Sequence, residues 1–153
     1  SSCDKQTISV TPVILPEIRV FMNGESKLRL GSTYTPGEIY DLIGKPIVVA
    51  YTHDSVMLTY NGMTLTFEAE VTNGNQWSAG RLSAVSLRKD EAFTLNDDLF
   101  VGMNISELLL IYPMLDECDY TGSFTNGDGE FVLDFEFDDY GNAVRIRLGE
   151  VNG

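Results

Sequence analysis

The stretch "TYTPGEIYDLIGKP", residues 33–46, decides the fold class that the sequence predicts. Thr35 is a favourable N-cap, Pro36 suits the first helical position, and Glu38 can complete a capping box with Thr35. A glycine and a proline then end the helix. The apolar stripe between these ends is Ile39, Leu42 and Ile43. A helix of about two turns is too short to persist alone in water, so it must pack on an apolar surface.

The stretch "VGMNISELLLIYP", residues 101–113, repeats this pattern. An asparagine stands at the cap position, Glu107 follows three residues later, and a proline again closes the helix. Its apolar stripe is Leu108, Ile111 and Tyr112. Glu38 and Glu107 are 69 positions apart, and Phe67 and Phe135, in the segments that follow the helices, are 68 apart. An offset that holds through helix and strand together predicts an internal repeat.

Each predicted helix precedes segments that alternate between apolar and polar residues, which is typical of half-buried strands. Asn61-Gly62 lies between two such segments and is the preferred turn of a two-residue β-hairpin. The third segment after the first helix is "RLSAVSL", residues 81–87, in which Leu82 is expected to point inward together with Val85 or Leu87. The inward positions expected in the second set are Phe131, Leu133, Phe135, Phe137, Val144, Ile146 and Leu148.

The sequence therefore predicts an α+β protein of two tandem units, each a short helix plus a three-stranded antiparallel β-meander, with the helices packed on one side of an antiparallel sheet. Residues 1–16 are expected to form an N-terminal tether. The first unit covers residues 17–89 and the second covers 90–153. A chain of 153 residues is long enough for both units to pack together as one compact domain.

The charge of the chain restricts its partners. Ten Lys and Arg residues oppose 23 Asp and Glu residues, which gives a formal net charge of −13. Such a charge repels nucleic acid and anionic membrane surfaces, because binding to phosphates needs clustered Lys and Arg. Basic proteins and divalent cations are compatible partners. No apolar run reaches the roughly 20 residues of a membrane-spanning helix.

The cysteines allow three interpretations. The start "SSCDK" resembles the end of a bacterial lipobox, so Cys3 is predicted to carry a lipid that anchors the protein to a membrane of the cell envelope. Alternatively, Cys3 and Cys118 form a disulfide in an oxidising compartment. The third interpretation is two unrelated thiols. The first two place the chain outside the cytoplasm, either anchored or secreted.

The repeated pattern resembles a known family. A glycine before each helix, the cap and glutamate, the closing proline and a meander ending in "GNAVRIRL" together resemble the tandem-repeat group that contains beta-lactamase inhibitory protein. The lipoprotein BamE carries one related helix-and-meander unit. The resemblance extends from about Leu28 to Leu148. It implies a non-catalytic secreted protein or lipoprotein that binds other proteins through its exposed sheet and loops, and it assigns no site residue.

Catalytic residues do not group in the sequence. His53 is the only histidine, and Asp54 and Ser55 follow it directly, whereas a catalytic triad assembles its members across space. We expect a surface loop here and no enzyme activity. Acidic residues offer a cation site instead: Asp134, Glu136 and Asp138 lie on the polar side of a predicted strand. Calcium binds such oxygen ligands, and a solvated strand face is the alternative.

Trp77 lies in the polar loop "NGNQWSAG" and suits an interface anchor or a sugar-binding platform. The alternative is that Trp77 folds back onto the core. Tyr34 and Tyr60 could extend an aromatic binding patch around it. The sequence thus predicts a protein-binding module without a cofactor, with a carbohydrate- or cation-binding surface protein as the alternative.

Overall fold

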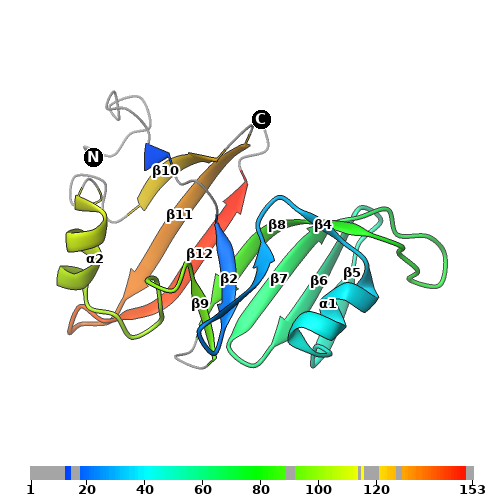
Figure 1. The fold of residues 1–153 in the computed structure, drawn as a ribbon, viewed down its shortest axis with the longest axis horizontal. Helices are drawn as coiled ribbons and strands as arrows, with labels where there is room; N and C mark the ends of the chain where they lie inside the picture. Colours follow the sequence, from blue (N-terminus) through cyan, green and yellow to red (C-terminus); the bar gives the residue numbers. More distant parts are fainter. Residues whose placement is uncertain are drawn as a thin grey trace.

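The computed structural model describes residues 13–14, 18–88, 92–113, 115, 121–126 and 129–150. Within this part of the chain, a nine-stranded sheet has the order β1-β10-β11-β12-β8-β7-β6-β5, with β4 beside β8, and a three-stranded sheet has the order β3-β2-β9 (Figure 1). The strands of the large sheet are β1 (Val13–Ile14), β4 (Thr33–Tyr34), β5 (Val48–Tyr51), β6 (Ser55–Tyr60), β7 (Met63–Glu68), β8 (Gly80–Leu87), β10 (Thr121–Asn126), β11 (Gly129–Phe137) and β12 (Ala143–Glu150). The small sheet contains β2 (Arg19–Met22), β3 (Glu25–Arg29) and β9 (Phe93–Leu95), and the helices are α1 (Pro36–Ile43) and α2 (Ile105–Ile111).

The predicted fold class is wrong, because the protein is mostly β and is not an arrangement of two helix-on-sheet units. The three-stranded sheet lies in front of the large sheet in Figure 1, with the short helices to either side. Val20, Leu28 and Leu95 of this small sheet are fully buried in the same core as the large sheet. The hairpin β2–β3 and its pairing with β9 were not predicted, since β2 and β9 are distant in sequence.

The helix ends are as the sequence predicts. At α1, Thr35 and Glu38 form the capping box, and Gly44 ends the helix with φ +89°. At α2, Asn104 and Glu107 form the equivalent box. The buried residues within the helices are Ile39, Ile43 and Leu108, whereas Ile111 of the predicted stripe is 38% exposed. Neither helix of the described chain has the length and hydrophobicity needed to cross a bilayer.

The hairpin at Asn61-Gly62 is also confirmed, since Tyr60 pairs with Met63 across a two-residue turn. Two β-bulges then change which residues face inward. The register of β7 and β8 shifts between Thr66 and Phe67. As a result Leu82, Val85 and Leu87 are all buried, although strict alternation would place Val85 and Leu87 on one face and Leu82 on the other.

A second bulge between Glu136 and Phe137 places Phe137 opposite Ala143. Ala143 is therefore buried, while Val144, which the sequence predicts to point inward, is 44% exposed. The other inward predictions on β11 and β12 hold for Phe131, Leu133, Phe135, Ile146 and Leu148, which are buried, and Phe137 packs partly buried against the core. β8 and β12 pair with each other at the middle of the large sheet.

Candidate functional site

The face of the large sheet opposite the core carries the candidate site. Directly opposed residues of antiparallel strands point to the same face. The register therefore aligns Met57, Thr66, Ala84, Gly149 and Val132 in one row across β6, β7, β8, β12 and β11. At roughly 4.8 Å per strand, this uncharged row is about 19 Å long. Small side chains in its middle leave the surface hollow.

Two depressions meet in this row. One of about 460 Å³ is bordered by Arg88, Asp134, Arg145 and Arg147. The other, of about 490 Å³, is bordered by Glu68 and Glu150 among others. Their shared floor is Thr66, Ala84 and Gly149. We call the row and the two depressions together the sheet trough.

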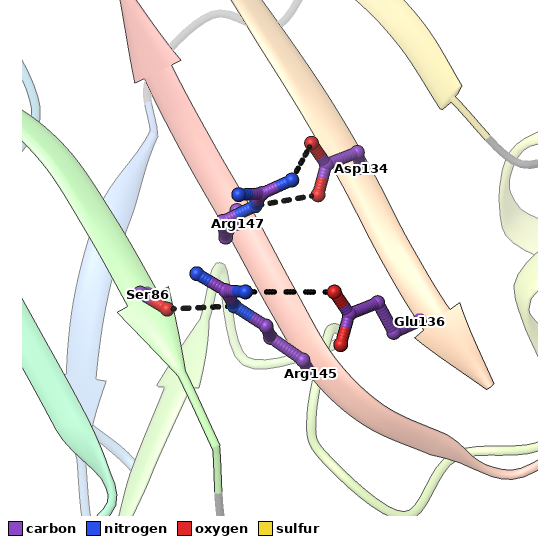
Figure 2. Close-up of polar contacts among 5 residues, drawn as sticks. All are labelled: Ser86, Asp134, Glu136, Arg145 and Arg147. Carbon is purple, nitrogen blue, oxygen red and sulfur yellow. Dashed lines mark hydrogen bonds and ion pairs between the residues drawn. The ribbon is translucent and has the colours of Figure 1, made fainter. Parts of the chain in front are cut away.

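Ion pairs between β11 and β12 form one wall of the sheet trough (Figure 2). Arg147 donates two hydrogen bonds to the carboxylate of Asp134, at 2.9 and 2.8 Å. Arg145 donates to Glu136 at 3.4 Å and to the Ser86 hydroxyl of β8 at 3.5 Å. The hydrogen bond to Asp134 raises the pKa of the Arg147 guanidinium, so this side chain keeps its charge at any physiological pH.

The opposite wall is formed by Glu68 of β7 and Glu150 of β12, and both carboxylates pair with Arg81 of β8. Two guanidinium nitrogens of Arg81 donate to the two oxygens of Glu150, and Glu68 approaches Arg81 at 3.7 Å. The hydrogen bond to Glu150 raises the pKa of Arg81. Only 11% of the Glu150 side chain is exposed, compared with 39% for Arg81. This pair therefore joins the two central strands β8 and β12.

Arginine side chains are concentrated around this site. The chain has only ten Lys and Arg residues; Arg88, Arg145 and Arg147 border the sheet trough, and a fourth, Arg81, pairs with the carboxylates Glu68 and Glu150 that border it. Arg81, Arg145 and Arg147 each form an ion pair with a carboxylate. The walls are therefore close to neutral, in a protein whose net charge is −13. The walls therefore present fixed hydrogen-bonding groups without forming a patch of a single charge sign.

The predicted aromatic patch is only partly assembled. Trp77 is half-buried and lies against Phe67, with ring centroids 6.0 Å apart. A Cβ at Gly80 would lie 3.2 Å from Trp77, and Gly80 pairs with Tyr34. Trp77 and Tyr34 thus both lie next to Gly80, and both pack partly buried against the core. This corresponds to the alternative in which Trp77 folds back onto the core.

Tyr60 is the last residue of β6 and lies away from Trp77 and Tyr34. Only 7% of Tyr60 is exposed, its ring meets Phe93 edge-on at 6.0 Å, and its hydroxyl donates to the Gly44 carbonyl at 2.8 Å. The residue joins the sheet to the end of α1. Its side chain is therefore part of the core and does not extend the surface around Trp77.

The three carboxylates predicted as a cation site do not converge. Asp134 and Glu136 share the outer face, as the alternation predicts, but each is paired with an arginine. Asp138 follows the strand and accepts from the backbone N–H groups of Tyr140 and Asn142, which stabilises a turn. Within the part of the chain that the structure describes, no three His, Cys, Asp or Glu side chains group as metal ligands.

His53 is 91% exposed and lies 3.7 Å from Asp54. The Ser55 hydroxyl shares a hydrogen bond with Thr52 at 2.7 Å. These neighbours form a surface turn, in agreement with the predicted loop. The lipidation and disulfide predictions concern Cys3 and Cys118, which lie outside the described residues, as does most of the predicted tether 1–16.

Prediction from the sequence identified Asp134 and Glu136, acidic residues of one wall of the sheet trough, but not the arginines or the floor residues. The signal was present in "AVRIRL". Because Ile146 and Leu148 of this strand are buried, alternation places Arg145 and Arg147 on its outer face. Which carboxylate each arginine meets depends on the register of β11 and β12, which alternation does not specify. Ala84 and Gly149 gave no signal, because a small residue marks a site only when its cross-strand neighbours are known.

No family model matches the chain, and neither the curated proteins nor the solved structures that were compared with it give a match. A functional proposal for this protein therefore depends on the geometry of its own surface.

Proposed function

We propose that the chain is a non-catalytic protein-binding module that works outside the cytoplasm and holds a protein partner in the sheet trough. The observation that carries this proposal is the hollow formed by Thr66, Ala84 and Gly149 between two walls of arginine–carboxylate pairs. Small residues let a partner approach the sheet closely. The paired arginines are held in place before binding, which reduces the conformational entropy lost on association.

The size and polarity of the surface support a protein partner. Specific protein interfaces are about as polar as the rest of the surface and are enriched in arginine. A trough about 19 Å long across five strands gives an extended contact and not an enclosed pocket for a small molecule. Nucleic acid is not among the partners we propose, because the net charge of −13 opposes phosphate binding.

Filling the sheet trough tests this proposal. Ala84→Arg places a long side chain on the floor of both depressions. We expect it to reduce partner binding by about tenfold or more, because a single badly placed residue at an interface centre costs over about 1.4 kcal/mol. The measurement is photocrosslinking in the native host, with p-benzoylphenylalanine at Thr66 as the reactive group and mass spectrometry to identify the adduct.

Tyr140→Arg is the matched control, because it adds the same charge at a residue that is 85% exposed and lies outside both depressions. The adduct should persist with Tyr140→Arg and disappear with Ala84→Arg. An adduct of equal intensity in both variants would show that the sheet trough is not the binding surface. Thermal unfolding of both variants verifies that each remains folded.

The proposed location has its own test. If Cys3 carries the lipid, Cys3→Ser should move the protein from the membrane fraction of the host to the soluble fraction and remove a diacylglycerol-sized increment from its intact mass. Cys118→Ser is the matched control and should change neither measurement. Equal effects of the two substitutions on mobility without reducing agent would instead support the disulfide.

A further inference from the structure

The two outer edges of the nine-stranded sheet differ. At one end, β1 pairs in parallel with β10 and covers its edge. At the other end, β5 pairs with β6, and no other described strand pairs with it (Figure 1). An edge strand presents unpaired N–H and C=O groups to which another extended chain can bind. The edge of β5 is therefore a second surface, which adjoins the end of the sheet trough at Met57 of β6.

The features that usually protect an edge strand lie before β5 and not within its paired residues. Proteins place charged residues, proline or bulges on exposed edges. Val48–Tyr51 contain no charge and no proline and pair regularly with β6; Lys45 and Pro46 precede this segment, and Ile47 also donates its N–H to Thr59, the residue opposite Val48. Large apolar side chains lie exposed beside this edge: Ile47 is 71% exposed, Val48 53% and Met57 43%.

The register indicates which backbone groups of β5 are open. Residues of an antiparallel pair alternate between positions bonded to the neighbour strand and positions that face away from it. Thr52 donates its N–H to Ser55 of β6, so Ala50 and Val48 are also bonded positions. The N–H and C=O groups of Val49 and Tyr51 then point away from the sheet, at the spacing of a strand that could be added.

We propose that the edge of β5 binds an extended segment of a partner protein as an added strand, and that this segment has apolar residues flanked by lysine or arginine. The net charge of −13 favours a basic segment and opposes a second copy of the same chain, since two such copies repel each other. Asp54, which follows β5 in the turn to β6, is exposed for a contact with a flanking cation.

This inference goes beyond the proposed function, because it concerns a strand edge and a backbone-mediated contact. The two proposals can fail separately. Ala84→Arg fills the sheet trough and should leave binding at the β5 edge unchanged. A substitution at Val49 should leave a contact that uses only the sheet trough unchanged.

The probe is a peptide of about ten residues, with alternating valine and threonine and two lysines at each end. Amide hydrogen exchange of the whole protein, measured by NMR, should slow by about tenfold or more at Val49 and Tyr51 when this peptide is added. A peptide of the same core with glutamates in place of the lysines should bind several-fold more weakly at low salt.

Val49→Pro removes one outward N–H without removing a bond to β6, and proline is tolerated at such an edge position. Val49→Ala is the matched control, because it loses similar packing and keeps the N–H. We expect Val49→Pro to weaken peptide binding by about tenfold and Val49→Ala to retain it. The exchange measurement on the unsubstituted protein still decides the question if Val49→Pro does not fold.

Three results would overturn the inference. The first is unchanged exchange at Val49 and Tyr51 at millimolar peptide. The second is equal peptide binding by Val49→Pro and Val49→Ala when both are folded. The third is protection of the same amides at high protein concentration without peptide, together with a dimer in analytical ultracentrifugation, because the occupant would then be a second copy.

Discussion

Phe67→Ala is expected to lower the free energy of unfolding by about 3–5 kcal/mol, the usual cost of removing a large aromatic side chain from a packed core. Phe67 is 0% exposed and pairs with Val56 of β6 and Leu82 of β8. A Cβ at Gly80 would lie only 2.9 Å from the Phe67 Cβ, so packing is already tight on that side. The surrounding sheet cannot collapse readily into the cavity.

A loss of this size is a large share of the roughly 5–15 kcal/mol by which a domain is usually stable. It should be measured by urea unfolding with far-UV circular dichroism. The fluorescence of Trp77 would be ambiguous, because this ring contacts Phe67 in the native state. Thr64→Ala is the matched control on the same strand, since Thr64 faces the sheet trough and should cost less than about 1 kcal/mol. A Phe67→Ala loss as small as the control's would contradict the position of Phe67 in the core.

The free energy of unfolding is also expected to fall steeply between pH 10 and 12. Burial raises the pKa of Tyr112 from its ordinary value of 10.0 to about 12, and the charge of Asp98 acts in the same direction. Burial likewise raises the pKa of Tyr60. These residues are 5% and 7% exposed. Each phenol is therefore harder to ionise in the folded state than in the unfolded state.

The direction follows from proton binding. Below pH 10 both states keep the two phenols protonated, and the full stability is present. Above pH 10 the unfolded chain releases these protons while the folded protein retains them, so unfolding becomes more favourable as the pH rises. A pKa difference of two units corresponds to about 2–3 kcal/mol for Tyr112 by pH 12. Tyr60 adds a loss in the same direction.

Urea unfolding at pH 8 and pH 12 measures this loss directly. Tyr112→Phe should retain about 2–3 kcal/mol more of its pH 8 stability than the unsubstituted protein does. Tyr140→Phe is the matched control at a residue that is 85% exposed, and it should leave the alkaline loss unchanged. Similar alkaline losses in all three proteins would show that burial of Tyr112 is not the cause.

Tyr60→Phe should behave differently at the two pH values. At pH 8 it removes the hydrogen bond to the Gly44 carbonyl and should cost about 1 kcal/mol. At high pH it also removes the buried phenol whose ionisation favours unfolding, so the variant should lose less stability than the parent as the pH rises. The same urea series provides this comparison.

The local structure of the protein could be predicted from its sequence because it depends on neighbouring residues. The capping boxes of Thr35–Glu38 and Asn104–Glu107 each join residues three positions apart. The turn at Asn61-Gly62 joins two adjacent strands, and Gly62 has φ +84°, which a two-residue hairpin turn requires. The inward and outward sides of most strand residues followed from alternation alone.

The sequence by itself thus determined helix ends, hairpin turns and the polar character of the outer sheet face, since each involves contacts within a few residues. Only the tertiary structure decided that the protein is mostly β and that a three-stranded sheet covers part of the core. It also decided the sheet trough, because pairing of β8 with β12 brings Ala84 next to Gly149 and Arg81 next to Glu150. Those pairs are more than 60 positions apart, and their register depends on the packing of the whole sheet and on its bulges, which a local pattern does not encode.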